Sequence, residues 1–423
     1  MTATSVTPTA TTLAIHGGVP VRTAPFPRRI VVGQAERDAV VALLDREMEC
    51  GGGFDRYGGI EVDAYEREFA VHFGTSYATS TSSGTAAVHT ALAALRPEPG
   101  GEVICAPVTD PGGVMPVVWM QCIPVFADVD PDTFNLDPAS VAERITARTS
   151  AIIVTHLAGQ PADLDPLLEI TRKHHLPIIE DCAQSHDAVY KGRKVGSIGD
   201  LGAFSLMGGK HSTAGGQGGM VTMNDESLYW NAKRFADRGK PFNSDERLNL
   251  FLGLNYRMTE LGAAIGRVQL RKLPALVAHR RSLAAMLREQ IADVPGVRLG
   301  KVIDGANPVY WFLLVKVDAA QMQVSHDEFV RAVAAEGIPV QPRYDYMVSE
   351  SPWMRDQQTF GKSGLPWSRT PASESVQYAG SCPNARRAID SHMVVSFHEG
   401  YTDLDVADIA AALRKVAHAY GVA

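Results

Sequence analysis

The chain has 423 residues, of which 45% are hydrophobic and 21% charged, and its 40 basic and 47 acidic side chains leave a net charge of −7. This composition is that of a folded globular protein and excludes an intrinsically disordered chain. The acidic excess argues against a nucleic-acid partner, which requires a basic face to neutralise phosphates.

Neither the cysteines nor the apolar segments indicate secretion or a membrane. The five cysteines are odd in number and lack CxxC spacing, which favours reduced thiols over a disulfide framework. The first 18 residues have no basic leader, and the longest apolar run, 114–127, is too short to cross a bilayer. We therefore expect a cytoplasmic protein with no membrane partner.

From about residue 30 to 270, short apolar runs alternate with helical patterns. The predicted strands lie at 102–107, 123–129, 151–156, 176–181, 201–206 and 219–223. The helical patterns between them lie at 83–95, 138–147 and 164–175. This alternation predicts an α/β domain with a mostly parallel sheet. The last two strands are joined by a short glycine-rich loop, so the sheet need not be wholly parallel.

A long helical pattern begins at about residue 259 and leads into a second region. That region has strand candidates at 309–317 and 393–397 and helix candidates at 326–336 and 404–420. It also contains an irregular segment, 345–382, of the kind that is often functional. We expect three parts: an N-terminal tail and arm (1–29), a large domain (30–270) and a smaller C-terminal α+β domain (271–423).

Two residues that follow predicted strands are candidates for chemistry, because sites in open α/β sheets form beyond the carboxyl ends of the strands. Asp181 closes the strand 176–181, although a capping role is the commoner explanation for such an acid. Glu180 is expected on the opposite side of that strand. Lys210 lies among glycines after the strand 201–206, where burial would favour a nucleophilic amine, although most lysines are solvated surface charges.

A third candidate is the segment Ser82-Ser83-Gly84-Thr85-Ala86, which opens a predicted helix. Small residues with free N–H groups at a helix N-terminus form an anion site, although plain N-capping is commoner. An anion site, an acid at a strand end and a lysine are the three parts that pyridoxal phosphate requires. The phosphate needs the anion site, the pyridinium nitrogen needs the carboxylate, and the aldehyde needs the lysine.

Several segments carry a resemblance to a known family. They are SSGTAAVHTAL, GEVICAPVT, PIIEDCAQSHDA, GDLGAFSLMGGKHSTAGGQGGMVT and LNYRMTELGAAIGRVQL. Their order and spacing resemble the DegT/DnrJ/EryC1/StrS family of pyridoxal-phosphate-dependent sugar and aminocyclitol aminotransferases. The resemblance implies the fold type I architecture and a homodimer with active sites at the subunit interface. It implies transfer of an amino group from glutamate or glutamine to a keto-sugar or keto-cyclitol in the biosynthesis of amino sugars or aminocyclitols.

The resemblance also implies roles for residues around the cofactor ring. Lys210 matches the lysine that forms the Schiff base, and Asp181 matches the carboxylate that pairs with the pyridine nitrogen. Gln184 matches the residue beside the 3-hydroxyl of the cofactor. Asp110 falls where the family usually has an aromatic residue stacked on the ring. An aspartate cannot stack, so either another group covers the ring face or this loop is rebuilt for a different substrate.

Four further residues match the family's phosphate site. Gly84 and Thr85 match its phosphate-binding turn, and Ser205 matches a serine at a strand end that also binds the phosphate. Asn255, in the segment Asn255-Tyr256-Arg257-Met258, matches an asparagine supplied by the neighbouring subunit. From the residues alone, that segment is also explained as a loop and helix cap.

Two other functions stay open at this stage. One is a sugar dehydratase of the same family, in which a histidine replaces the lysine; His211 next to Lys210 makes the register important. The other is a non-catalytic regulator that binds the cofactor. No histidine or cysteine spacing predicts a metal site. Candidates for polar residues lining the substrate site are Arg56, Tyr57, His156 and His398.

Overall fold

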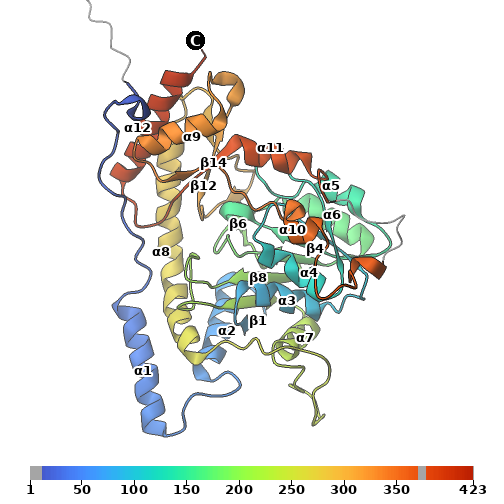
Figure 1. The fold of residues 1–423 in the computed structure, drawn as a ribbon. Coiled ribbons are helices and arrows are strands. Elements are labelled where there is room, and N and C mark those ends of the chain that lie inside the picture. Colours follow the sequence, from blue (N-terminus) through green and yellow to red (C-terminus); the bar gives the residue numbers. More distant parts are fainter. Residues whose placement is uncertain (1–11, 370–377, 423) are drawn as a thin grey trace, which may run out of the picture.

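A seven-stranded sheet forms the centre of the molecule (Figure 1); the computed structural model describes residues 12–369 and 378–422. The strand order is β1-β9-β8-β5-β4-β2-β3. Strand β9 pairs antiparallel with both of its neighbours, and every other pair is parallel. The bounds are β1 Tyr77–Thr81, β2 Glu102–Cys105, β3 Ile123–Phe126, β4 Thr149–Thr155, β5 Ile178–Asp181, β8 Leu201–Ser205 and β9 Gly219–Met223.

The sequence prediction of this sheet is confirmed for six of the seven strands, including the antiparallel one. Strand β1 was missed because its sequence, YATST, is mostly polar, and its burial between α2 and α3 comes only from the tertiary structure. The helices predicted between the strands are also present. They are α3 (Gly84–Ala94), α5 (Pro138–Arg144) and α6 (Leu164–His174).

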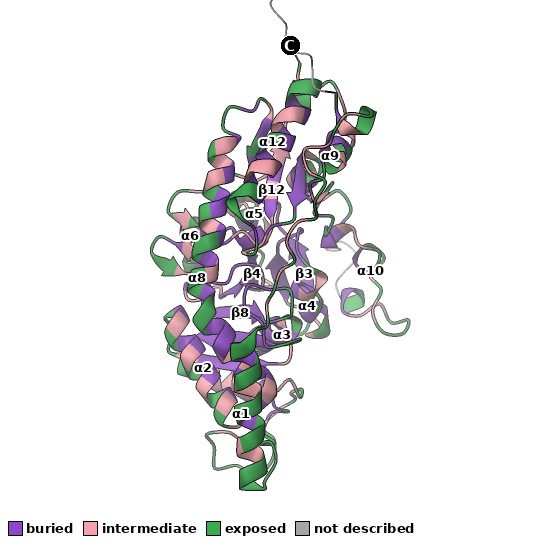
Figure 2. Cartoon of the chain, turned by 90° about the vertical axis from the view of Figure 1, so that its left-hand side faces the viewer, coloured by how far each residue is buried: buried purple, intermediate pink, exposed green. Residues whose placement is uncertain are grey.

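Helices cover both faces of the sheet, which explains why its strands are apolar throughout. Ile153 on β4 faces a core cluster that includes residues of α3, α4 (Met115–Trp119) and α7 (Glu226–Phe235). Its neighbours Ile152 and Val154 face a second cluster with α2 (Ile60–Phe73), α6 and α8 (Glu260–Gln290). Figure 2 shows the sheet as buried ribbon between these layers. The carboxyl ends of the parallel strands are therefore left as the open edge.

Helix α8 begins beside the large sheet and continues into a second, smaller layer of structure (Figure 1). There a four-stranded antiparallel sheet has the order β10-β12-β14-β13. Its strands are β10 Val297–Leu299, β12 Leu313–Val317, β13 Val340–Gln341 and β14 His392–Val395, and its helices are α9 His326–Ala335 and α12 Asp403–Tyr420. The predicted strands and helices of this region are thus confirmed.

The remaining elements are short or peripheral. Helix α1 (Gln34–Cys50) packs on α8 and buries only Glu36 and Leu43. A small sheet joins β6 (Val189–Tyr190), β7 (Arg193–Lys194) and β11 (Ala306–Asn307). Helices α10 (Pro352–Arg355) and α11 (Pro383–Ser391) lie near the large sheet, where Met354 and Ile389 join its core. None of the described helices is long and apolar enough to cross a membrane.

Part of the predicted irregular segment, 370–377, and most of the predicted tail, 1–11, lie outside the described residues. The described part of the segment packs against the large sheet, since Met347, Val348 and Trp367 belong to the same core as Val108. The division of the chain at residues 29 and 270 stays a prediction.

Candidate active site

A cavity of about 280 Å³ opens beyond the carboxyl ends of β5 and β8. Lys210, Asp181, Ser205, Gly84, Thr85 and Asp110 all line it. Its other lining residues include Ser83, Gly113, Ala183, Gln217 and three aromatic side chains, Trp311, Tyr344 and Tyr346. The structure therefore brings together six of the eight site residues that the sequence predicts.

One end of the cavity is the N-terminus of α3. The side chain of Ser83 caps the helix by accepting a hydrogen bond from the Ala86 N–H at 3.1 Å. The N–H groups of the first turn, at Gly84 and Thr85, have no partner inside a helix, and they point along its axis. A Cβ on Gly84 would lie 2.5 Å from the Cβ of Ser205, so only glycine lets the helix approach the end of β8 this closely. This geometry is suited to an anion.

Asp181 is the last residue of β5 and is only 4% exposed. One carboxylate oxygen, Oδ1, accepts a hydrogen bond from the Ala183 N–H at 3.0 Å. A Cβ on Gly113 would lie 2.8 Å from the other oxygen, so the loop after β2 passes directly over this carboxylate. Burial raises the pKa of Asp181, while the backbone N–H of Ala183 and the nearby Lys210 ammonium oppose that rise. An ionised Asp181 is thus favoured by a cationic partner in the cavity.

Lys210 lies in the turn after β8 and is 6% exposed. Its Nζ is 3.7 Å from the centroid of the Trp311 ring, and the indole N–H donates a hydrogen bond to the Gly209 carbonyl at 3.2 Å. Burial lowers the pKa of Lys210 to about 8, although the Asp181 and Asp110 carboxylates oppose that shift. A substantial fraction of the amine is therefore neutral near pH 7 to 8, as a nucleophile or proton carrier requires.

The backbone of Lys210 is held by an arginine from the N-terminal arm. The Arg29 guanidinium donates hydrogen bonds to the carbonyls of Gly209 and Lys210 at 3.0 and 2.9 Å. The same guanidinium forms an ion pair with Glu399 at 2.7 Å, and the fully buried Arg280 pairs with that carboxylate from the other side. Segments from both ends of the chain thus fix the lysine turn. Sequence reasoning missed Arg29, because nothing local marks a contact across 180 positions.

His211, the neighbour of Lys210, does not reach the cavity. It is fully buried, its Nε2 lies 3.2 Å from the Val309 carbonyl oxygen, and it is not among the residues that line the cavity. The lysine, and not the histidine, therefore faces the site.

Asp110 lines the cavity but is also the cap of a turn. Its Oδ1 accepts a hydrogen bond from the Gly112 N–H at 2.9 Å. The aromatic lining of the cavity comes instead from the C-terminal region. A bridge between Val108 and Met347 docks the segment that carries Tyr344 and Tyr346 beside the end of β2. No sequence pattern predicts this contact, because Val108 and Met347 are more than 200 residues apart in the chain.

Two predicted residues, Gln184 and Asn255, do not line this cavity. The Gln184 side chain is 97% buried and bonds to the Ala158 N–H and the Tyr344 hydroxyl. Asn255 lines a second cavity, of about 310 Å³, together with Arg56, Gly58 and Arg257. Within one chain, Asn255 and Lys210 thus belong to different cavities.

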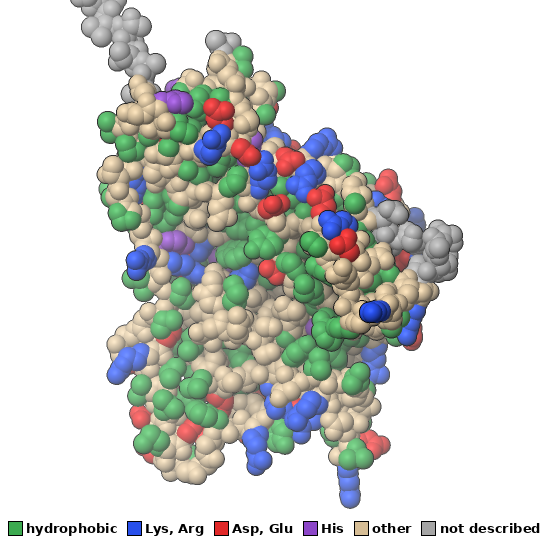
Figure 3. All heavy atoms as spheres, viewed as in Figure 1, with side chains coloured by type: hydrophobic (Ala, Val, Ile, Leu, Met, Phe, Trp, Pro, Cys, Tyr) green, Lys and Arg blue, Asp and Glu red, His purple; other side chains and the backbone are tan. Residues whose placement is uncertain are grey.

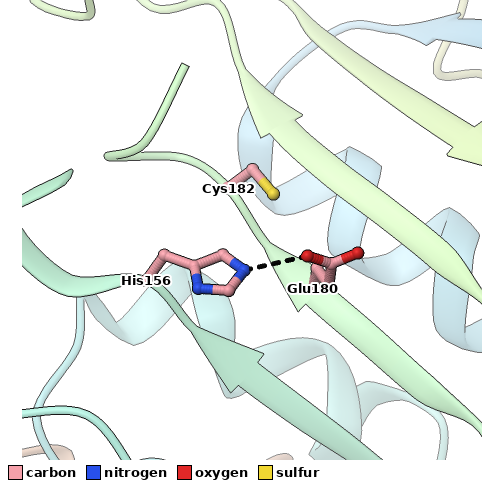
Figure 4. A group of neighbouring side chains, drawn as sticks. All are labelled: His156, Glu180 and Cys182. Atoms are coloured by element: carbon pink, nitrogen blue, oxygen red, sulfur yellow. Dashed lines mark hydrogen bonds and ion pairs between the residues drawn. The ribbon is translucent and has the colours of Figure 1, made fainter. Parts of the chain in front are cut away.

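The remaining polar candidates have structural partners. His398 hydrogen-bonds the carbonyl of Pro27 in the arm, and the Tyr57 ring is covered by the Lys240 ammonium at 4.0 Å. Figure 4 shows His156, Glu180 and Cys182, whose ligand atoms lie within 4.8 Å of one another and are all buried. Glu180 lies on the opposite side of β5 from the cavity, as expected.

The His156 and Glu180 side chains are already satisfied by hydrogen bonds. His156 Nδ1 accepts from the Ala162 N–H, so Nε2 donates to Glu180 at 3.0 Å. The Glu180 carboxylate also accepts from three backbone N–H groups, at Gly196, Ile198 and Gly199. This saturated network explains the cluster without a bound ion.

The comparisons with known proteins agree with this geometry. The model of the DegT/DnrJ/EryC1/StrS aminotransferase family matches residues 46–414. The GDP-perosamine synthase of Caulobacter vibrioides is 34% identical over 90% of this chain and 95% of that protein. A putative L-glutamine:3-amino-2,3-dideoxy-scyllo-inosose aminotransferase of Streptoalloteichus tenebrarius is 34% identical over 86% of this chain and 90% of that protein. The X-ray structure of an aminotransferase from Psychrobacter cryohalolentis superposes with a TM-score of 0.79 at 32% identity, over 92% of this chain and 98% of that one.

Proposed function

Because the chain belongs to the DegT/DnrJ/EryC1/StrS aminotransferase family, it is an aminotransferase, and we propose that its cavity holds pyridoxal phosphate. The observation that carries this proposal is the meeting of three groups in one cavity: the N-terminus of α3, Asp181 and Lys210.

The residues fit the three polar parts of this cofactor. The N–H groups of Gly84 and Thr85 and the Ser205 hydroxyl would hold the phosphate. Asp181, whose ionised form needs a cation, would hold the protonated ring nitrogen. Lys210 would bond to the aldehyde carbon through Nζ. Two further predicted residues complete the cofactor site. Gln184 would lie near the hydroxyl oxygen of the cofactor ring, and Asp110 would cap the loop that covers the ring.

When bound, pyridoxal phosphate withdraws electrons from the carbon that carries the transferred amino group. The chain then has to move a proton to and from that carbon. Lys210 is suited to this task because burial lowers its pKa to about 8, so that Nζ both accepts and releases a proton near neutrality. The Trp311 ring covers one side of the amine, which is largely buried. Asp181 would hold the protonated ring nitrogen and so would maintain the electron withdrawal.

For the substrates, we propose glutamine or glutamate as donor and a keto-sugar or keto-cyclitol as acceptor. Supporting relatives are named L-glutamine:2-deoxy-scyllo-inosose aminotransferase, 34% identical over 78% of this chain, and the inosose aminotransferase described above. Such acceptors present hydroxyl groups, and the cavity offers polar groups on Asp110, Gln217 and Tyr346. The place of the reaction in amino sugar or aminocyclitol biosynthesis is part of the same proposal.

We also propose a homodimer with shared active sites. Lys210 is the only lysine or arginine among the described lining residues, so the carboxylate of an amino-acid donor lacks a cationic partner within one chain. The second cavity, with Arg56, Arg257 and Asn255, could supply one across an interface.

An exposed apolar surface supports that interface. It comprises Val41, Leu44 and Met48 on α1, and Phe54 and Tyr57 just after it. Hydrophobic side chains appear at the lower left of Figure 3, where Figure 1 places α1. Patches of this kind mark interaction sites.

The proposed chemistry is tested with purified protein, added pyridoxal phosphate, each donor, and a panel of keto-sugars and inososes. We expect a visible absorption band on adding the cofactor, which glutamine or glutamate discharges, and an aminated product detected by mass spectrometry. Lys210→Ala should abolish the band and lower turnover by about 10²- to 10⁴-fold. The exposed Lys301→Ala is the matched control. A wild-type protein that never forms the band would overturn the proposal.

The shared site is tested by mixing two variants that the proposal expects to be inactive, Lys210→Ala and Asn255→Ala. In a mixed dimer, one site carries both defects and the other carries neither, so activity should return after subunit exchange. Sedimentation of the wild-type chain as a monomer, or mixtures that stay inactive although they exchange, would exclude the shared site.

A further inference from the structure

Asp110 lines the cavity with a carboxylate of which only one oxygen is engaged. Its Oδ1 accepts a hydrogen bond from the Gly112 N–H at 2.9 Å, and its carbonyl accepts one from the Gly113 N–H at 2.9 Å. On the other side, the Thr109 N–H donates to the Tyr346 carbonyl at 3.1 Å. The residue is thus fixed in its turn, while no described residue donates a hydrogen bond to Oδ2 or forms an ion pair with Asp110.

The charges around the cavity leave this carboxylate without a counterpart. The described lining contains two carboxylates, Asp110 and Asp181, and one cation, Lys210. In the proposed function, the ring nitrogen of the cofactor matches Asp181, and Lys210 bonds to the aldehyde carbon. A substrate that enters the cavity therefore meets, at Asp110, an oxygen that accepts hydrogen bonds and cannot donate one.

We propose that Asp110 determines which amino donor the enzyme uses, because its Oδ2 accepts a hydrogen bond from the side-chain amide of glutamine. The N–H₂ group of that amide fits a carboxylate oxygen, whereas the side-chain carboxylate of glutamate meets it as a like charge. Glutamine is therefore the donor, and Asp110 is a specificity-determining residue. This inference rests on the proposed function, since the donor must react in the cavity that holds Asp110.

A capping role alone does not require the second oxygen of Asp110. Asparagine and serine also cap such a turn, because one side-chain oxygen is enough to accept from the Gly112 N–H. In Asp110→Asn, the amide oxygen stays with that N–H, so the N–H₂ group replaces Oδ2 and an acceptor becomes a donor. In Asp110→Ser, the hydroxyl caps the turn and no acceptor replaces Oδ2. Both variants keep the loop and change only what faces the cavity.

The test compares how fast glutamine and glutamate each discharge the visible band of the protein loaded with pyridoxal phosphate, without an acceptor present. The readout is the ratio of the two second-order rate constants. A change in the pKa of Lys210 affects both donors alike, so this ratio isolates the contact with the donor side chain. We expect the wild-type protein to prefer glutamine by about 10-fold or more, the effect of one hydrogen bond to a charged group.

The two variants should change the ratio in a fixed order. Asp110→Ser should bring it close to one, because neither donor then gains or loses at this position. Asp110→Asn should reverse it in favour of glutamate, whose carboxylate accepts from the new N–H₂ group. Asp345→Asn is the matched control for loss of a negative charge, because Asp345 is exposed between Tyr344 and Tyr346 but does not line the cavity. It should keep the wild-type ratio.

Several results would overturn the inference while leaving the proposed function intact. They are a wild-type preference for glutamate, a ratio that stays unchanged in Asp110→Asn, and an equal change in Asp345→Asn. Loss of the band in both Asp110 variants, but not in Asp345→Asn, would make Asp110 a cofactor contact and would also overturn it. A wild-type protein that forms no band, or whose band neither donor discharges, would defeat the proposed function instead.

Discussion

The Nζ of Lys210 lies 3.7 Å from the centre of the Trp311 ring. An indole face attracts a cation. Burial of the amine, to which the Trp311 ring contributes by covering it, lowers the pKa of Lys210 to about 8. The contact with the Trp311 ring thus keeps the Lys210 amine in place, while burial leaves the amine easy to deprotonate. Trp311 comes from the C-terminal region, so the reactivity of the lysine depends on both parts of the fold.

The first prediction concerns the charge balance around this amine. Asp110→Asn should lower the pKa of Lys210 below about 8, because the Asp110 carboxylate opposes the effect of burial. Asparagine still caps the turn at Gly112, so the loop is retained. The pH dependence of acylation of Lys210 in the cofactor-free protein, followed by mass spectrometry, measures this pKa. An unchanged or higher pKa would mean that Asp110 does not act on the amine.

The second prediction concerns the N-terminal arm. Arg29→Gln removes the hydrogen bonds to the carbonyls of Gly209 and Lys210, and should lower kcat by about 10- to 100-fold through misplacement of the amine. Arg22→Gln is the control, since Arg22 also ties the arm to the C-terminal region, through Asp405 and Asp408, without touching the lysine turn. Both changes should lower the free energy of unfolding by about 1–3 kcal/mol.

Only Arg29→Gln should affect kcat, and Arg29→Lys should restore part of it by keeping one donor. Equal losses of kcat in the Arg22 and Arg29 variants would show that the arm acts through stability alone. Steady-state kinetics and urea unfolding of the same preparations separate these outcomes.

The third prediction concerns the contact between α3 and β8. A Cβ on Gly84 would lie 2.5 Å from the Cβ and 2.8 Å from the Oγ of Ser205. Gly84→Ala should therefore push the helix N-terminus away, lower the free energy of unfolding by about 1–3 kcal/mol and weaken binding of pyridoxal phosphate. Gly52→Ala is the control, because its Cβ would meet nothing within 4 Å. Unfolding curves and fluorescence titration with the cofactor would reveal the effect; wild-type affinity in Gly84→Ala would contradict it.

The fourth prediction concerns the buried pair His156 and Glu180. Glu180→Gln places an amide N–H₂ group among N–H donors, and should lower the free energy of unfolding by about 1–3 kcal/mol. Dialysis against a chelator, or addition of zinc, should leave the melting temperature of the wild-type protein unchanged, because the lone pairs are already occupied. A rise in melting temperature with zinc that is lost in Glu180→Gln would instead identify a metal site.

The sequence alone determined the large sheet and the identity of its key groups. Apolar runs bounded by turns predicted six strands, because a strand buried on both faces must be apolar whatever surrounds it. Asp181, Lys210 and Gly84 could be singled out because a strand end or a helix start is a local feature, readable from neighbouring residues. Strand β1 was not predicted, because its sequence is mostly polar and its burial depends on packing against α2 and α3.

Only the tertiary structure decided what surrounds the lysine. Trp311 and Arg29 reach the lysine turn, and Tyr344 reaches the cavity wall, from segments far away in the chain, and such contacts leave no periodic signal in the sequence. The structure also determined which neighbouring side chain faces the cavity: Lys210 lines it, whereas His211 is buried against the Val309 carbonyl, which comes from a distant segment. The local pattern thus fixed which groups are present, while packing between distant segments decided their orientation and acidity.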